Sequence, residues 1–222
     1  MHRCEGKWIE AYQDKKAFWM HSGDNTKPHA LLTSRKHSNG FFNSRLIIAD
    51  EPLLNEAAAD LLEMYLKHYG GAINDIDGVV GPQTGATKLA KLICQHVVNE
   101  TGSDRFYASP AKYTDEDGVK SMVFTDEDLL LLAGNTILLC EDVVTTGGSI
   151  GLTAEAAEKA NATVMPYIVT LVNRSGQSEI DNRKIISLIS KHMPTWAEEE
   201  CPLCKTGSQA LPAKDNWNEL NK

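Results

Sequence analysis

Short apolar runs alternate along this chain with longer segments in which apolar residues recur at helical spacing. Runs at 76–80, 137–140 and 163–172 predict strands that are buried on both faces of a sheet. Helical spacing follows the first run at 89–97, and an alanine-rich segment follows the second run at 150–160. Strand, loop and helix therefore recur in order, which predicts one α/β domain with a parallel sheet flanked by helices.

The first third of the chain predicts further elements. Residues 7–20 are rich in aromatic side chains at partly helical spacing, which predicts an amphipathic helix. Two short apolar runs within 30–48 flank Asn39-Gly40, a strong signal for the turn of a β-hairpin. Asp50 can cap a helix that ends at Gly70-Gly71.

The candidate chemistry lies just after the run at 137–140. Glu141 and Asp142 stand at the end of that strand, and a loop of small and hydroxyl-bearing residues leads into the next helix. Gly147 and Gly148 let the backbone approach a ligand closely, and the helix directs free N–H groups to the same place, which suits a phosphate monoester. The carboxylates would repel a phosphate, so they suit the vicinal hydroxyls of a ribose or a metal ion bridging to them. The predicted ligand is a ribose 5-phosphate derivative at the carboxyl end of the sheet.

Residues 137–149 read Ile-Leu-Leu-Cys-Glu-Asp-Val-Val-Thr-Thr-Gly-Gly-Ser, which resembles the phosphoribosyl pyrophosphate (PRPP) signature of type I phosphoribosyltransferases. The resemblance implies a Rossmann-like fold with an N-terminal hood, and a catalytic part for Glu141 and Asp142. It implies Mg²⁺ as cofactor, held mainly through PRPP, with no metal site on the protein itself. The implied PRPP-binding residues are Glu141, Asp142, Val143, Val144, Thr145, Thr146, Gly147, Gly148 and Ser149.

A second glycine-containing loop follows the run at 76–80 and resembles the pyrophosphate loop of the same family. Residues 109–125, which are polar and acidic, stand where the family has its mobile catalytic loop, and this composition suits a lid of low stability. Lys112 is the first candidate there for a cation that binds pyrophosphate, and Lys120 is the second. The resemblance also implies a homodimer in which Lys112 serves the neighbouring subunit's site. The implied pyrophosphate-loop residues are Gly81, Pro82, Gln83, Thr84 and Gly85.

The segment 30–48 resembles the hood that orotate phosphoribosyltransferases lay over the nucleobase. The matching positions are Ser34, Ser38, Phe41, Phe42 and Asn43. The resemblance implies that Phe41 or Phe42 packs near the base and that Thr145 adds to the base site. It also implies that Arg174 meets the carboxylate of orotate, since a guanidinium group pairs with a carboxylate through two hydrogen bonds.

Two departures from the orotate pattern keep other functions open. Thr33 stands where the family often has a lysine, with Arg35, Lys36 and His37 nearby, and the catalytic-loop pattern Arg-Lys-x-x-Lys-x-His-Gly is absent. The predicted function is transfer of ribose 5-phosphate from PRPP to a nucleobase, with orotate first. The alternatives are a phosphoribosyltransferase for another base, as in purine salvage, and a PRPP-binding regulator without catalysis.

Composition and charge limit the classes of partner that this chain can bind, and its length limits the number of domains. The chain has 222 residues and a formal net charge of −8, which argues against nucleic acid as a partner because phosphate backbones need a basic surface. No run approaches the length needed to span a membrane. We expect a single domain with a hood at about 1–50, a core at about 51–175, and a C-terminal strand and tail at about 176–222.

The five cysteines have no disulfide-framework spacing, and together with the missing signal region they predict a reducing cytoplasm. Cys201 and Cys204 form a Cys-x-x-Cys pair, a pattern found in zinc sites and in redox-active sites. Structural zinc needs four ligands, and the sequence offers no second pair. Cys4 and His192 are the possible partners named from sequence, and the prediction remains that the protein has no metal site.

Overall fold

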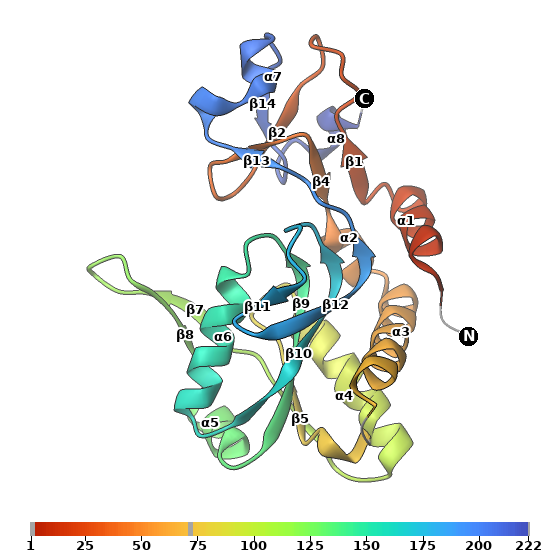
Figure 1. Ribbon diagram of the computed structural model, residues 1–222, viewed down its shortest axis with the longest axis vertical. Coiled ribbons are helices and arrows are strands. Elements are labelled where there is room, and N and C mark those ends of the chain that lie inside the picture. The colour runs from red at the N-terminus through yellow and green to blue at the C-terminus, as the bar shows by residue number, and fades with distance from the viewer. Residues whose placement is uncertain (1–2, 71–72, 222) are drawn as a thin grey trace.

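A six-stranded sheet forms the centre of the protein (Figure 1). The computed structural model describes residues 3–70 and 73–221. The strand order is β11-β12-β10-β9-β5-β6, and every pairing is parallel except that of β11 with β12. The strands are β5 (Gly78–Val80), β6 (Phe106–Ala108), β9 (Thr136–Val144), β10 (Thr163–Asn173), β11 (Glu179–Ile180) and β12 (Arg183–Ser190). The α/β class predicted from the sequence is confirmed.

Helices cover both faces of this sheet. Strand β9 shows why, because Leu138 and Cys140 pack into one apolar cluster while Ile137 and Leu139 pack into the other. The first cluster includes side chains of α1, α3 and α4, and the second includes side chains of α6. The long helices are α1 (Glu5–Asp14), α3 (Glu51–Tyr69), α4 (Thr87–Thr101) and α6 (Gly148–Lys159). A strand buried on both faces reads as a continuous apolar run, as the sequence predicted.

Capping residues set the ends of α3 where the sequence placed them, and a capping box begins a second helix. The side chain of Asp50 accepts a hydrogen bond from the Leu53 amide, and Gly70 ends α3 in the left-handed conformation with φ +65°. Gly71, the second glycine of the predicted stop, lies outside the described residues. Thr125 and Asp128 form a capping box at the start of α5 (Asp126–Leu132).

The N-terminal helix predicted for 7–20 is wrong in its second half. Helix α1 ends at Asp14, and Phe18–Met20 form β1, which pairs antiparallel with β4 (Gly40–Phe42). Phe18 then stacks on Phe42, with ring centroids 4.7 Å apart. Contacts between the two strands outweigh the weak helical signal of the local sequence.

The hairpin predicted around Asn39-Gly40 exists, but its turn lies elsewhere. Strands β2 (His29–Leu31) and β3 (His37–Ser38) pair through a turn in which Arg35 has φ +61°. Gly40 lies within the paired strand β4 and packs closely against Met193, whose sulfur would lie 2.9 Å from an added Cβ. The second apolar run forms the short helix α2 (Ser44–Ile48) in place of a strand.

The C-terminal tail joins the hood. Strands β13 (Thr195–Trp196) and β14 (Ala210–Pro212) flank the hairpin in a four-stranded sheet of order β13-β3-β2-β14. Two short helices, α7 (Pro202–Lys205) and α8 (Trp217–Leu220), and the 3₁₀ turn η2 (Glu198–Glu200) complete this layer. A second 3₁₀ turn, η1 (Ile73–Asp75), precedes β5 in the core. Figure 1 shows the tail and the N-terminal strands together as one layer above the central sheet.

Residues 109–125 form an ordered two-stranded ribbon of β7 (Ala111–Thr114) and β8 (Lys120–Val123), where the sequence predicted a polar loop. The ribbon projects from the body of the protein in Figure 1, and β7 is exposed along its whole length. Within the part of the chain that the structure describes, we find no helix long and apolar enough to cross a bilayer.

Candidate active site

A cleft of about 1480 Å³ lies between the hood and the carboxyl ends of β9 and β10. Strand order reverses between β5 and β9, since β6 extends the sheet to one side and β10 to the other. Open α/β sheets bind ligands outside the carboxyl ends of their strands at such a reversal. Most of the residues singled out in the sequence line this cleft or a smaller pocket of about 440 Å³ that shares Asp142 and Lys112 with it.

The loop between β9 and α6 has the geometry of an anion site. Gly147 has φ +84° and precedes the first residue of α6, and its position lets Ile180 pack within 2.7 Å of where a Cβ would stand. The first α-helical bond runs from the Gly151 amide to the Gly147 carbonyl, so the preceding amides lack a partner within the helix. Thr145, Thr146 and Gly148 are exposed and line the cleft, which places hydroxyls and amides together at the positive end of the helix dipole.

The two carboxylates at the end of β9 differ in environment. Glu141 is buried, and its Oε1 accepts a hydrogen bond of 3.0 Å from the Asp142 amide. Burial, followed by the charge of Asp142, raises the pKa of Glu141 well above its usual range, and the charge of Lys112 acts against this rise. Asp142 is half-buried, accepts a hydrogen bond from the Val143 amide, and lines both pockets.

The second loop is packed directly against Asp142. A Cβ on Gly85 would lie 2.6 Å from the Asp142 carboxylate, so only glycine permits this approach. The loop residues Pro82, Gln83, Thr84 and Gly85 line the smaller pocket. Gly81 lies behind them, where a Cβ would meet the Cys140 sulfur at 2.7 Å, and Val144 is buried in the core beneath the first loop.

Comparison with known proteins identifies the family. The phosphoribosyl transferase domain matches residues 44–202, which is most of the chain. The chain belongs to the phosphoribosyltransferase family.

Orotate phosphoribosyltransferases are among the similar proteins. That of Thermoanaerobacter sp. is 32% identical over 181 residues, covering 82% of this chain and 85% of the relative. That of Heliobacterium modesticaldum is 29% identical over 183 residues, covering 82% and 87%. The crystal structure of orotate phosphoribosyltransferase from Aeropyrum pernix superposes with a TM-score of 0.59 at 18% identity, covering 82% of this chain and 92% of that one. Both the type I family and its orotate branch were predicted from the sequence, and this prediction is confirmed.

In this phosphoribosyltransferase, Arg174 lies at the end of β10 with its side chain buried. Its guanidinium donates to Ser38 Oγ at 2.7 Å, to the Gly40 carbonyl at 3.3 Å and to the Met193 carbonyl at 3.5 Å. Burial lowers its pKa to about 10, so it stays charged at neutral pH. Across residues 3–70 and 73–221, no carboxylate pairs with it, and it lines the cleft.

The two hood phenylalanines occupy different environments. Phe42 is 3% exposed and packs between Phe18 and Tyr12 in the core of the protein. Phe41 is half-buried, lines the cleft, and lies 5.6 Å from the Trp217 ring. Phe41 is therefore the aromatic side chain that remains partly accessible to a ligand.

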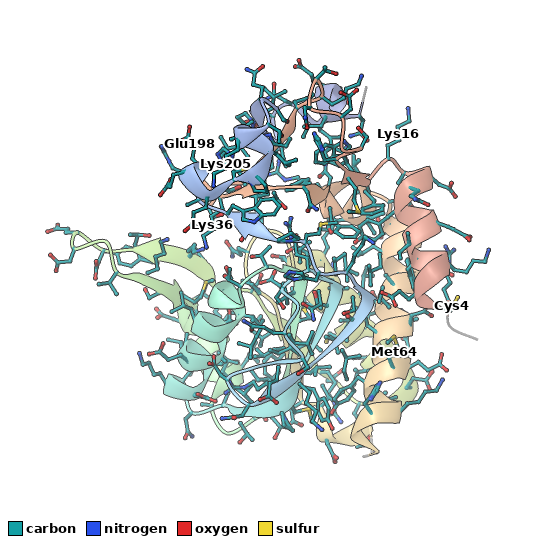
Figure 2. All side chains as sticks on the ribbon, turned by 45° about the horizontal axis from the view of Figure 1, so that its top comes forward. Cys4, Lys16, Lys36, Met64, Glu198 and Lys205 are labelled. Atoms are coloured by element: carbon teal, nitrogen blue, oxygen red, sulfur yellow. The ribbon has the colours of Figure 1, made fainter. Side chains whose placement is uncertain are left out.

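Basic side chains gather around the cleft although the chain is acidic overall. Lys112 and Lys120 of the ribbon line it, as the sequence suggested, together with Lys36 of the hood, which Figure 2 shows below the tail helix. Three further basic residues line the cleft and were not predicted from the sequence: Arg45, Arg183 and Lys214. Arg45 directly follows the hood pattern at Asn43-Ser44 and could have been found there, whereas Lys214 gave no local signal.

Gly85→Ala should weaken PRPP binding about tenfold or more, equivalent to roughly 1.4 kcal/mol, because the new methyl group must displace the Asp142 carboxylate. Isothermal titration calorimetry with PRPP measures the effect. Gly6→Ala in α1 is the matched control, since no heavy atom lies within 4 Å of its added Cβ. Equal affinity in all three proteins would contradict a role for this contact.

Glu141→Gln should raise the melting temperature of the ligand-free protein by a few degrees at about pH 8. The raised pKa means that ionisation of Glu141 costs stability once the pH exceeds the ordinary range of a glutamate, and the amide removes that cost. The gain should shrink as the pH falls toward about 4 and vanish below it, where the carboxyl group is protonated in both states. PRPP affinity should fall in the same variant.

Thermal melts across this pH range test the prediction, with Glu10→Gln as the control because Glu10 is exposed and forms its ion pair with the surface residue Lys7. A lower melting temperature for Glu141→Gln than for wild type at about pH 8 would show that the charged form is favoured in the fold.

Proposed function

We propose that this enzyme transfers ribose 5-phosphate from PRPP to orotate, giving orotidine 5′-phosphate and pyrophosphate. The observation that carries the choice of base is the buried Arg174 guanidinium, which has neutral partners and no carboxylate partner among the described residues. A guanidinium group has five N–H donors, and three contacts are formed here, which leaves donors for a ligand. An anionic base such as orotate supplies the missing negative charge.

The remaining groups of the cleft fit the parts of PRPP. The amides and hydroxyls of Thr145, Thr146 and Gly148 suit the 5-phosphate, and Glu141 and Asp142 suit the ribose hydroxyls. The loop at 82–85 and Lys112 suit the pyrophosphate. Thr145 and Phe41 line the cleft together with Arg174, and these three side chains suit the base.

This arrangement supports catalysis by positioning and charge stabilisation. The anomeric carbon gains oxocarbenium character as pyrophosphate leaves, so the protein needs no side-chain nucleophile. It must hold the nitrogen of the base in line, stabilise the leaving group with cations and exclude water. Side chains of the basic ribbon and of the hood line the cleft, where they can stabilise the leaving group and exclude water.

Magnesium is part of the proposal. Mg²⁺ prefers oxygen ligands and commonly binds through one or two carboxylates together with substrate phosphates. The Asp142 carboxylate lines both pockets and Glu141 lines the smaller one, so these two side chains fit an ion carried by PRPP. When bound, the ion would neutralise charge on the departing pyrophosphate.

We also propose a cytoplasmic homodimer. The five cysteines are free, which suits a reducing compartment. Exposed apolar side chains concentrate on the ribbon and on α5, where Leu130 is 81% exposed and Tyr113 is 54% exposed. Lys112 lines the cleft of its own chain, which supports a role within one subunit, and its predicted service to a neighbouring subunit stays a prediction.

Arg174→Ala should reduce kcat/KM for orotate roughly 30- to 1000-fold, because the substrate carboxylate loses its buried partner. This corresponds to a loss of about 2–4 kcal/mol of transition-state stabilisation. Pyrophosphate release from PRPP with orotate, hypoxanthine and adenine measures this. Arg183→Gln is the control, since Arg183 lines the same cleft but already pairs with Glu158. Turnover of a purine without turnover of orotate would overturn the choice of base, and no turnover with PRPP binding retained would favour the regulator.

Leu130→Glu should convert the proposed dimer into a monomer at micromolar concentration, because it places a charge in an apolar contact. Light scattering after size-exclusion chromatography measures the mass. Met20→Glu makes the same kind of change at an exposed hood position and should leave the dimer intact. A monomeric wild-type protein would contradict the proposal.

A further inference from the structure

Four potential metal ligands meet in the hood, outside the active-site cleft. They are His29 and His37, at the starts of β2 and β3, and Cys201 and Cys204, at the two ends of the first turn of α7. Their ligand atoms all lie within 4.8 Å of one another, and His29, His37 and Cys201 are almost fully buried. We propose that these four side chains bind one structural zinc ion.

The distances between the ligand atoms suit a common metal centre. His29 Nε2 lies 2.9 Å from His37 Nδ1 and 3.5 Å from the sulfur atoms of both cysteines, and Cys204 Sγ lies 3.2 Å from His37 Nδ1. Tetrahedral zinc, with Zn–N near 2.0–2.1 Å and Zn–S near 2.3 Å, separates nitrogen ligands by about 3.3 Å and nitrogen from sulfur by about 3.6 Å. These four distances differ from the tetrahedral values by about 0.4 Å or less, so small side-chain shifts would bring these atoms into a zinc site.

Hydrogen bonding fixes the tautomer that zinc requires at His29. Ser208 Oγ donates its proton to the Lys27 carbonyl at 2.7 Å, so it must accept from His29 Nδ1–H, which lies 2.9 Å away. His29 Nε2 is then unprotonated and directs one lone pair toward three other groups. A single lone pair cannot serve three hydrogen bonds, whereas one cation at the centre satisfies all four ligands. Such an outer hydrogen bond is the usual orienting contact of a metal-binding histidine.

The ligand set selects zinc among the common divalent ions. Two thiolates and two neutral imidazoles balance the 2+ charge, and this combination in a closed, buried site is typical of structural zinc. The alternative, a redox Cys-x-x-Cys pair, does not account for the two histidines placed against it. The partners considered from the sequence are not in the cluster, and Figure 2 shows Cys4 on the far side of the molecule from Lys205 of α7.

The ion would stabilise the hood, whose own apolar core is small. Among the described residues, the hood cluster has three buried apolar residues, Ala30, Ala213 and Leu220, with half-buried Trp19, Leu32, Phe41 and Leu211 packed against them. This is a small core for four short strands. Zinc would join the β2–β3 hairpin to the tail between β13 and β14. Ser38, next to His37, accepts a hydrogen bond from Arg174, so the ion would also fix the wall of the base site.

The full chain, purified from zinc-supplemented medium, should contain about one zinc per protein by plasma mass spectrometry. The zinc content of Cys204→Ser and of His37→Gln should be at least tenfold lower than that of wild type. Cys4→Ser and Cys94→Ser should retain the wild-type content, because neither of those cysteines is in the cluster. Chelation should lower the melting temperature of wild type by several degrees and leave that of Cys204→Ser unchanged.

A second measurement uses wild-type protein alone, so it does not depend on whether the variants fold. Wild-type protein stripped of metal and titrated with Co²⁺ should show thiolate-to-cobalt charge-transfer absorption and tetrahedral ligand-field bands at one equivalent. Wild-type protein with less than about a tenth of an equivalent of zinc and no cobalt–thiolate bands would overturn the proposal. So would a Cys201–Cys204 disulfide found by mass spectrometry in the freshly purified protein. These readouts do not depend on PRPP or orotate.

Discussion

The active-site cleft depends on a buried guanidinium group that joins two layers of the protein. Arg174 extends from the end of β10 and donates hydrogen bonds to Ser38, Gly40 and Met193, which lie in the hood or on the segment that leads into the tail. A buried charge without a counter-charge is costly, and neutral acceptors offset only part of that cost. The same contacts that hold the hood over the sheet thus leave a positive group ready for an anionic ligand, so base binding and hood position are physically coupled.

Charge is separated along the cleft in a way that suits a substrate with several anionic groups. Glu141 and Asp142 occupy the end of β9, while lysine and arginine side chains from the hood, the ribbon and the tail surround them. Glu141 is destabilising in its ionised form because it is buried beside Asp142. Retaining such a group where apolar packing would be more stable is the pattern of a functional site, in which stability is lost locally to preorganise charge.

The hood is a composite of both ends of the chain. Residues near 30 pair with residues near 210, and those near 38 pair with those near 195. This layer has little apolar core, and the proposed zinc ion would tie its two parts together close to Arg174. The central sheet has two large apolar clusters and needs no such support.

The sequence by itself determined the elements whose signals are local. Buried strands read as apolar runs, Asp50 and Thr125 cap helices through their own neighbours, and the loop at 145–149 follows from its glycines and hydroxyls. Tertiary structure decided everything that depends on distant pairing. Gly40 looked like a turn residue but lies in β4 and packs against Met193, and His29 meets Cys201 across 172 positions of the chain. Such contacts leave no local pattern, because their free energy belongs to a pair of segments that only the complete fold brings together.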